Sequence, residues 1–196
     1  MMRDMGPVAL PASRAAVPGQ TPTGPILGVD PGLRCTGYAV LSEGVGDAEA
    51  RLIEAGAIKL DAKRSLAQRL LELQDCVDEL LRAHEPATLA CEELYSHYKH
   101  PRTAILMAHA RGIILAQAAR RGLQIVPVSA TRAKKLLTGS GRAGKAQMQR
   151  AVARTLGLPT LPEPHDVADA LAIALCGLRL RAAEQRAMTG VAEARR

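Results

Sequence analysis

The run Ile26-Leu27-Gly28-Val29-Asp30-Pro31-Gly32 joins a short apolar segment to a carboxylate and then to a Pro-Gly turn. Its apolar residues favour a β-strand, and the Pro-Gly pair stops strand pairing, so Asp30 projects where the chain leaves the sheet. A second apolar run, Tyr38-Ala39-Val40-Leu41, follows after a short turn and predicts an antiparallel partner strand. Open α/β sheets hold their ligands at such strand ends. Asp30 is therefore the first candidate site residue.

Two other segments also place acids at the ends of apolar runs. The run Thr88-Leu89-Ala90-Cys91 predicts a buried strand that ends on Glu92. Asp166 and Asp169 stand three residues apart at the start of an apolar helical pattern, which puts them on one helix face. Acidic residues are also common caps in the first turn of a helix, so this pair alone does not define a site. The shared setting of all the acids, beside core-type apolar residues, favours a function over solvation.

A cluster of these carboxylates would repel itself unless a cation lay among them. Oxygen-only sites suit hard ions such as Mg²⁺ or Mn²⁺. Two such ions, about 4 Å apart, hold the attacking and leaving oxygens during displacement at a phosphodiester. The acids therefore predict metal-dependent phosphoryl chemistry with water as the nucleophile.

The order of the elements predicts the fold class. Strands are expected at 26–30, 37–43, 51–59, 88–92 and 124–128, and helices at 64–84, 101–121, 130–138, 145–156 and 166–182. Three consecutive strands followed by alternating helices and strands predict an α/β fold, a mixed five-stranded sheet with helices on both faces. We expect residues 1–25, which contain several prolines, to be a disordered extension, residues 26–182 to form one domain, and residues 183–196 to be a polar tail.

The chain resembles the RuvC family of crossover junction endodeoxyribonucleases (Holliday junction resolvases) of the ribonuclease H-like superfamily. The resemblance covers roughly residues 26–182 and is carried by Gly28-Val29-Asp30-Pro31-Gly32, Thr36-Gly37-Tyr38, Glu92-Glu93-Leu94-Tyr95, Ala110-Arg111-Gly112 and Asp166-Val167-Ala168-Asp169-Ala170-Leu171-Ala172-Ile173-Ala174. It implies a ribonuclease H-like nuclease that cuts four-way DNA junctions by paired symmetrical nicks in recombination and repair. It also implies a branch-migration helicase complex as a partner.

The resemblance makes Asp30, Glu92, Asp166 and Asp169 the catalytic acids that bind the metal. Some family members carry His where this chain has Asp166, and His165 directly precedes it. We assign the role to Asp166 because only it keeps the three-residue spacing to Asp169. His165 remains a candidate for a supporting or proton-transfer group.

Basic residues indicate an anionic partner. The chain has a net charge of +7, although an Ala- and Arg-rich composition can also reflect a genomic bias. Arg142, which lies in a Gly-rich connection, is a candidate phosphate contact. By resemblance, Lys134 and Lys145 occupy positions where the family keeps lysines that contact DNA or assist catalysis; the alternative is that each is a solvated charge. The segment 139–146 approaches a phosphate-binding P-loop, but Ala146 lacks the hydroxyl and a helix precedes it, so nucleotide binding is not expected.

The chain has no Trp or Phe and only three Tyr, two of which lie in Tyr95-Ser96-His97-Tyr98. Rings beside a catalytic acid favour stacking on unpaired bases. By resemblance, Tyr95 falls where the family carries an aromatic residue near the junction centre. The alternative is that Tyr95 packs on the end of the strand.

The four cysteines show no CxxC spacing, which is typical of reduced thiols in a cytoplasmic protein. No run reaches the length of a membrane span. A homodimer is expected because paired nicks in a junction of near two-fold symmetry need two active sites, and the helix at 101–121 is the candidate interface. The alternatives are an actin-like kinase, for which the chain is too short, and a non-catalytic module that binds branched DNA.

Overall fold

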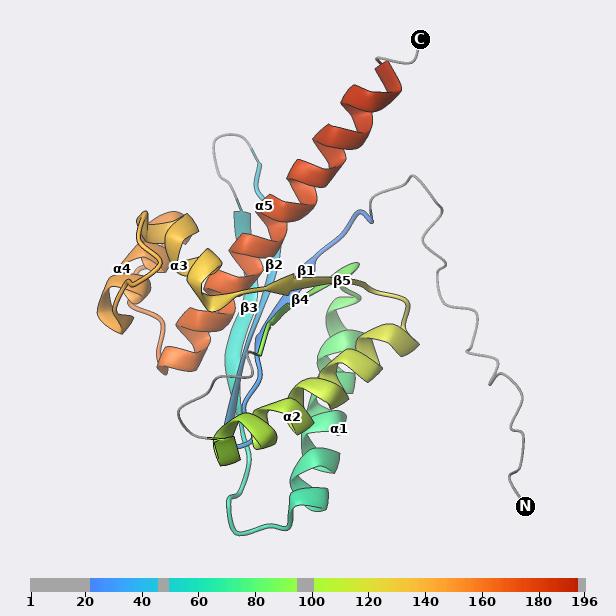
Figure 1. Ribbon diagram of the computed structural model, residues 1–196, viewed down its shortest axis with the longest axis vertical. Coiled ribbons are helices and arrows are strands. Elements are labelled where there is room, and N and C mark those ends of the chain that lie inside the picture. The colour runs from blue at the N-terminus through green and yellow to red at the C-terminus, as the bar shows by residue number, and fades with distance from the viewer. Residues whose placement is uncertain (1–21, 46–49, 95–100, 194–196) are drawn as a thin grey trace, which may run out of the picture.

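The computed structural model describes residues 22–45, 50–94 and 101–193. These residues contain strands β1 (Ile26–Asp30), β2 (Cys35–Glu43), β3 (Ala50–Lys59), β4 (Thr88–Glu92) and β5 (Gln124–Val128). The sheet has the order β3-β2-β1-β4-β5, in which β2 runs antiparallel to β1 and β3, while β4 runs parallel to β1 and β5 (Figure 1). The predicted mixed five-stranded sheet is confirmed.

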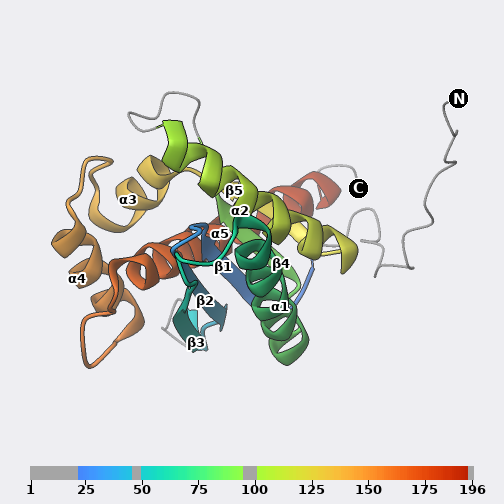
Figure 2. The same ribbon diagram turned by 90° about the horizontal axis from the view of Figure 1, so that it is seen from below.

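Helices cover both faces of this sheet, as predicted. Helices α1 (Leu66–His84) and α2 (Pro101–Arg120) lie on one face, and α5 (His165–Glu193) crosses the other. Helices α3 (Ala130–Thr138) and α4 (Lys145–Leu156) pack on α5 (Figure 2). The helix starts follow from local chemistry: Ser65 caps α1 with a reciprocal capping box, and Ser129 accepts from the backbone of Arg132 to cap α3.

The alternation of side chains along β1 divides the core into two layers. Leu27 and Val29 pack with the apolar residues of α1 and α2, while Ile26 packs with those of α5. Residues 170–176 of α5 are all buried, because the sheet covers one side of this helix and α3 and α4 cover the other. The apolar run in the sequence is therefore a core helix.

Glycine allows α5 to lie very close to the sheet. A Cβ added at Gly28 would stand 2.5 Å from the Cβ of Ala174 and 2.6 Å from the backbone oxygen of Ala170. Side chains are packed at crystal-like density in such interfaces, so there is no room for even one methyl group.

The C-terminal helix is longer than predicted. We expected it to end at residue 182, but α5 continues to Glu193 and runs past the sheet (Figure 1). The predicted end was wrong because it was set where the sequence becomes polar, although the helix already contains a buried arginine, Arg181, before that point. Arg181 is fully buried and donates to the backbone oxygen of Gly24 at 2.9 Å, to Thr88 Oγ1 at 3.2 Å and to Glu43 Oε1 at 3.1 Å. These partners lie far away in the sequence, so local patterning could not reveal them.

The expected extension at residues 1–25 lies largely outside the described residues, and the domain limits remain a prediction. Among the helices of the described ranges, none combines the length and apolar composition needed to span a bilayer.

The close approach at Gly28 gives a stability prediction. Gly28→Ala should lower the free energy of unfolding by about 1–3 kcal/mol, the usual cost of overpacking a core, and thermal unfolding measures it. Gly144→Ala is the control, because an added Cβ there would meet no atom within 4 Å. A melting temperature that falls equally in both variants would contradict the close packing of α5.

Candidate active site

The sheet brings Asp30 and Glu92 together at one edge. Each is the last residue of its strand, and β1 and β4 pair in parallel with Val29 beside Cys91. The carboxyl ends of both strands therefore meet at the same edge.

The first turns of α5 bring the remaining acids to this edge. A Cβ at Gly37 of β2 would stand 1.9 Å from the backbone oxygen of Asp166, so the start of α5 lies directly on β2. Asp169 follows one turn later. The tight contact fixes how far α5 reaches over the strand ends.

A cavity of about 120 Å³ contains three of the predicted acids. Asp30, Glu92 and Asp169 line it together with Lys134 of α3, and Met148 and Ile173 are among the apolar residues of its wall. The structure thus gathers residues that are 139 positions apart in the sequence around one small polar space.

The fourth predicted acid, Asp166, does not line this cavity. It borders a neighbouring cavity of about 270 Å³ together with Asp30, Arg34, Cys35 and Arg69. Asp30 lies between the two cavities and lines both. Asp166 nevertheless belongs electrostatically with the other acids, because its charge raises the pKa of both Asp30 and Asp169.

Burial governs the electrostatics of the acids. It raises the pKa of Asp30 to about 9, and a side-chain hydrogen bond to Glu92 together with the charges of Glu92, Asp169 and Asp166 contributes in the same direction. Burial likewise raises the pKa of Glu92 and of Asp169, while Lys134 lowers both and Lys145 also lowers that of Asp169. The hydrogen bond between the two carboxyls raises the pKa of Asp30 and lowers that of Glu92, so Asp30 is the donor of the pair.

The donor set fits a hard divalent cation. Carboxylate oxygens at the end of a sheet are ligands of the kind that Mg²⁺ and Mn²⁺ prefer, and a dication would favour the ionised form of Asp30, which burial and the neighbouring carboxylates disfavour. Within the described ranges, no three His, Cys, Asp or Glu side chains stand in the arrangement of a closed metal cage. The hydrogen bond between Asp30 and Glu92 occupies oxygens that would turn to the ion.

The other predicted site residues differ in how near they lie to the acids. Lys145 begins α4 on the side of Asp169, whose pKa it lowers, whereas Arg142 is exposed in the turn before α4 and lines neither cavity. His165 is exposed at the first position of α5. Tyr95 lies outside the described residues.

The sequence analysis missed polar residues that hold the backbone around the acids. Arg111 Nε donates to the backbone oxygen of Glu92 at 2.9 Å, and Arg69 Nη2 donates to that of Leu33. Thr36 is fully buried and its hydroxyl donates to the backbone oxygen of Gly32 at 2.5 Å. Arg111 and Thr36 belong to the motifs that carry the family resemblance, and this could have marked them as candidates. No feature of the sequence marked Arg69.

The sheet order, the layers of helices and the acid-lined cavity at the strand ends define the class of the fold, a mixed α/β sheet with a cluster of carboxylates at one edge. The comparisons identify the family within this class. The chain belongs to the RuvC family, because the family model described as crossover junction endodeoxyribonuclease RuvC matches residues 26–177.

A curated relative and two solved structures illustrate the similarity. The chain is 50% identical over 153 residues to the crossover junction endodeoxyribonuclease RuvC of Rhodopirellula baltica, covering 78% of this chain and 84% of the relative. It superposes with a TM-score of 0.74 and 29% identity on Thermus thermophilus RuvC in complex with Holliday junction substrate, covering 82% of this chain and 96% of that one. The yeast mitochondrial Holliday junction resolvase Ydc2, at 13% identity, 87% coverage of each chain and a TM-score of 0.60, shows the same fold.

The raised pKa of Asp30 predicts that the protein becomes less stable to unfolding as the pH rises. Because its pKa lies near 9 in the folded state and at the ordinary 3.8 when unfolded, ionisation favours unfolding and stability falls as pH rises between these values. Asp30→Asn removes this ionisation. In EDTA the variant should melt above the wild type, with a difference that widens with pH.

Exposed Asp75 of α1 provides the control, since Asp75→Asn should show no such trend. Added Mn²⁺ should raise the melting temperature of the wild type but not of Asp30→Asn, because an ion that binds only the folded state stabilises it. Equal melting curves for Asp30→Asn and the wild type at every pH would show that ionisation of Asp30 does not destabilise the folded protein.

Proposed function

We propose that this protein is a structure-specific endonuclease that resolves four-way (Holliday) DNA junctions by paired symmetrical nicks. The observation that carries the proposal is the cavity in which Asp30, Glu92 and Asp169 surround a space beside Lys134, in a chain of the RuvC family. The solved complex of Thermus thermophilus RuvC with a Holliday junction substrate supports the choice of substrate. The role follows from the substrate: homologous recombination and DNA repair, in the cytoplasm.

We assign catalysis and metal binding to Asp30, Glu92, Asp166 and Asp169. Two Mg²⁺ or Mn²⁺ ions per site, when bound, would neutralise the phosphate and lower the pKa of the attacking water. The position of Asp30 between the two cavities supports a shared ligand. Lys134 adds a positive charge inside the cavity, where low dielectric strengthens its effect on a phosphate. Water attacks phosphorus and the 3′ oxygen leaves, which yields a 5′-phosphate and a 3′-hydroxyl.

The approach to the cavity is basic and suits the DNA backbone. Lys145 and Arg142 follow one another along the connection into α4, and both side chains are exposed. We assign phosphate contacts to them and to Lys134, and base stacking at the junction centre to Tyr95.

Cleavage of a synthetic junction tests the function. The wild type with Mg²⁺ or Mn²⁺ should cut a four-way junction symmetrically and leave linear duplex intact, with ends that DNA ligase can rejoin. Asp30→Asn, Glu92→Gln and Asp169→Asn should abolish cutting while junction binding in a gel-shift assay persists, because only the acid cluster is changed. Asp75→Asn is the control. Wild-type binding without cutting would instead support a non-catalytic branched-DNA module.

We further propose that the active species is a homodimer formed through α2. Ala110, Ile114 and Ala118 of this helix face the core, but Ile105 is 57% exposed and an added Cβ at Gly112 would meet nothing within 4 Å. The helix is therefore not enclosed by its own chain, and its outer face offers small and apolar residues to a second copy. A branch-migration helicase complex, proposed from the family, would deliver the dimer to its substrate.

A charge on the outer face of α2 tests the dimer. Ile105→Glu should give a monomer in sedimentation velocity at micromolar concentration and replace paired nicks with single nicks, because burial of a carboxylate opposes association. Leu71→Glu is the control, since Leu71 is 58% exposed on α1. If Ile105→Glu remains a dimer, the interface lies elsewhere. If a monomer makes paired nicks, cleavage does not require a dimer.

A further inference from the structure

We propose that Arg69 and Arg111, from the two helices behind the sheet, are positioning residues that hold the backbone of the catalytic strand ends. This inference rests on the proposed function and adds residues to it. Neither arginine lines the cavity that contains Glu92 and Asp169; Arg111 bonds the backbone carbonyl of Glu92 itself, and Arg69 bonds that of Leu33, three residues after Asp30.

Arg111 fixes the end of β4. Its Nε donates to the backbone oxygen of Glu92 at 2.9 Å, while the next amide, that of Glu93, donates to the backbone oxygen of Val128 at 2.9 Å. The last peptide of β4 is thereby held from two directions, by α2 and by β5. Because the Glu92 side chain leaves the same residue, this clamp fixes the point from which its carboxylate projects.

Arg69 fixes the turn that follows Asp30. Its Nη2 crosses from α1 to the backbone oxygen of Leu33, three residues after Asp30. The same turn is closed by Thr36, whose hydroxyl donates to the backbone oxygen of Gly32 and accepts from the amide of Gly32 at 3.1 Å. Arg69 also lines the cavity that Asp30 and Asp166 share.

The burial of Arg69 indicates a specific role for its guanidinium group. The residue is only 8% exposed, and its Nε has no hydrogen-bond partner. Within the described ranges, neither arginine is paired with a carboxylate. A buried cation without an ion pair costs desolvation energy that an apolar side chain of similar length avoids. Its bond to the carbonyl of Leu33, in the turn that follows Asp30, gives a reason for that cost.

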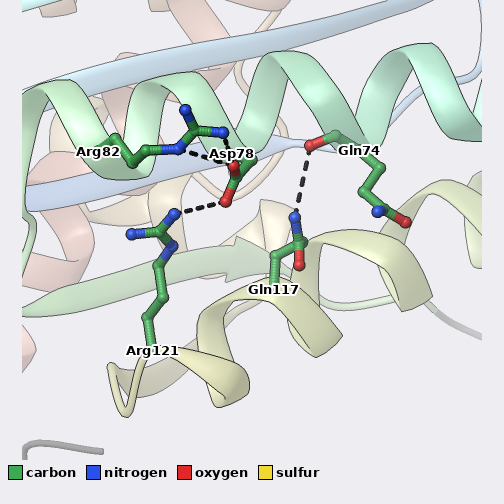
Figure 3. Close-up of polar contacts among 5 residues, drawn as sticks. All are labelled: Gln74, Asp78, Arg82, Gln117 and Arg121. Atoms are coloured by element: carbon green, nitrogen blue, oxygen red, sulfur yellow. Dashed lines mark hydrogen bonds and ion pairs between the residues drawn. The ribbon is translucent and has the colours of Figure 1, made fainter. Parts of the chain in front are cut away.

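Arg121 provides a matched control from the same layer. It follows α2 and bonds Asp78 of α1, to which Arg82 also donates, and Gln117 of α2 reaches the backbone oxygen of Gln74 nearby (Figure 3). Arg121 therefore joins the same two helices as a side-chain ion pair, with no bond to the backbone of a catalytic strand. Its loss should affect the packing of α1 and α2 and nothing at the acids.

The experiment compares Arg69→Met, Arg111→Met and Arg121→Met with the wild type. We would measure thermal stability, junction affinity without divalent ions, the rise in melting temperature caused by Mn²⁺, and the single-turnover cleavage rate with saturating enzyme. We expect both positioning variants to cleave about ten- to a hundredfold more slowly, the usual effect of displacing a catalytic group by about 1 Å. Their junction affinity should be unchanged, and the Mn²⁺-induced rise in melting temperature should shrink. Arg121→Met should lose stability only.

Arg69→Lys and Arg111→Lys extend the test if a methionine variant fails to fold. A lysine can still donate to a carbonyl, so the cleavage rate should recover in part. The proposal is overturned if the Met variants are folded and cleave at the wild-type rate, or if Arg121→Met slows cleavage to the same extent. The comparison requires that the wild type and Arg121→Met both cut junctions. If both are inactive, the proposed function itself fails, and not only the role of the two arginines.

Discussion

The close packing of α5 on β1 and β2 is the constraint on which the rest of the structure depends. Gly28 and Gly37 leave no space for a Cβ against Ala174 and Asp166, so the helix lies at one distance and in one register on the sheet. That register carries Asp169 over the ends of β1 and β4, where Asp30 and Glu92 emerge. A residue with a larger side chain at either glycine would lift the helix and separate the acids. Packing and chemistry are thus fixed by the same contact.

The acids oppose the stability that this packing supplies. Burial raises the pKa values of Asp30, Glu92 and Asp169, and the pKa of Asp30 reaches about 9 because the hydrogen bond to Glu92 and the neighbouring carboxylate charges add to the effect of burial. Proteins keep such arrangements where function needs them, at the expense of stability. Lys134 offsets part of the repulsion from within the cavity, and the bound cations of the proposed mechanism would offset more. The cluster of carboxylates is therefore suited to a ligand of high positive charge.

The helices on the two faces of the sheet contribute different residues around the acids. The face covered by α5, α3 and α4 supplies Asp169, Lys134 and the basic approach, while the face covered by α1 and α2 supplies the arginines that hold the strand ends and the surface proposed for the dimer. The edge of the sheet that carries Asp30 and Glu92 lies between the two layers of helices, since both residues end strands that are covered by helices on both faces. A partner copy bound on α2 would therefore lie beside the helix that holds Glu92.

The sequence by itself determined the elements that depend on short-range order. The apolar runs that end on Asp30 and Glu92, the Pro-Gly turn after Asp30 and the three-residue spacing of Asp166 and Asp169 act over a few residues. Together with the order of the other apolar runs and the motifs of the resemblance, they predicted the sheet, the strand-end acids and the family. Only the tertiary structure decided that Asp166 borders a different cavity from Glu92, that α5 extends to Glu193 around a buried Arg181, and that Arg69 and Arg111 hold carbonyls 36 and 19 residues away. These contacts join residues whose distance in sequence carries no periodic signal. They exist only because the helices pack on the sheet at the positions that the core allows.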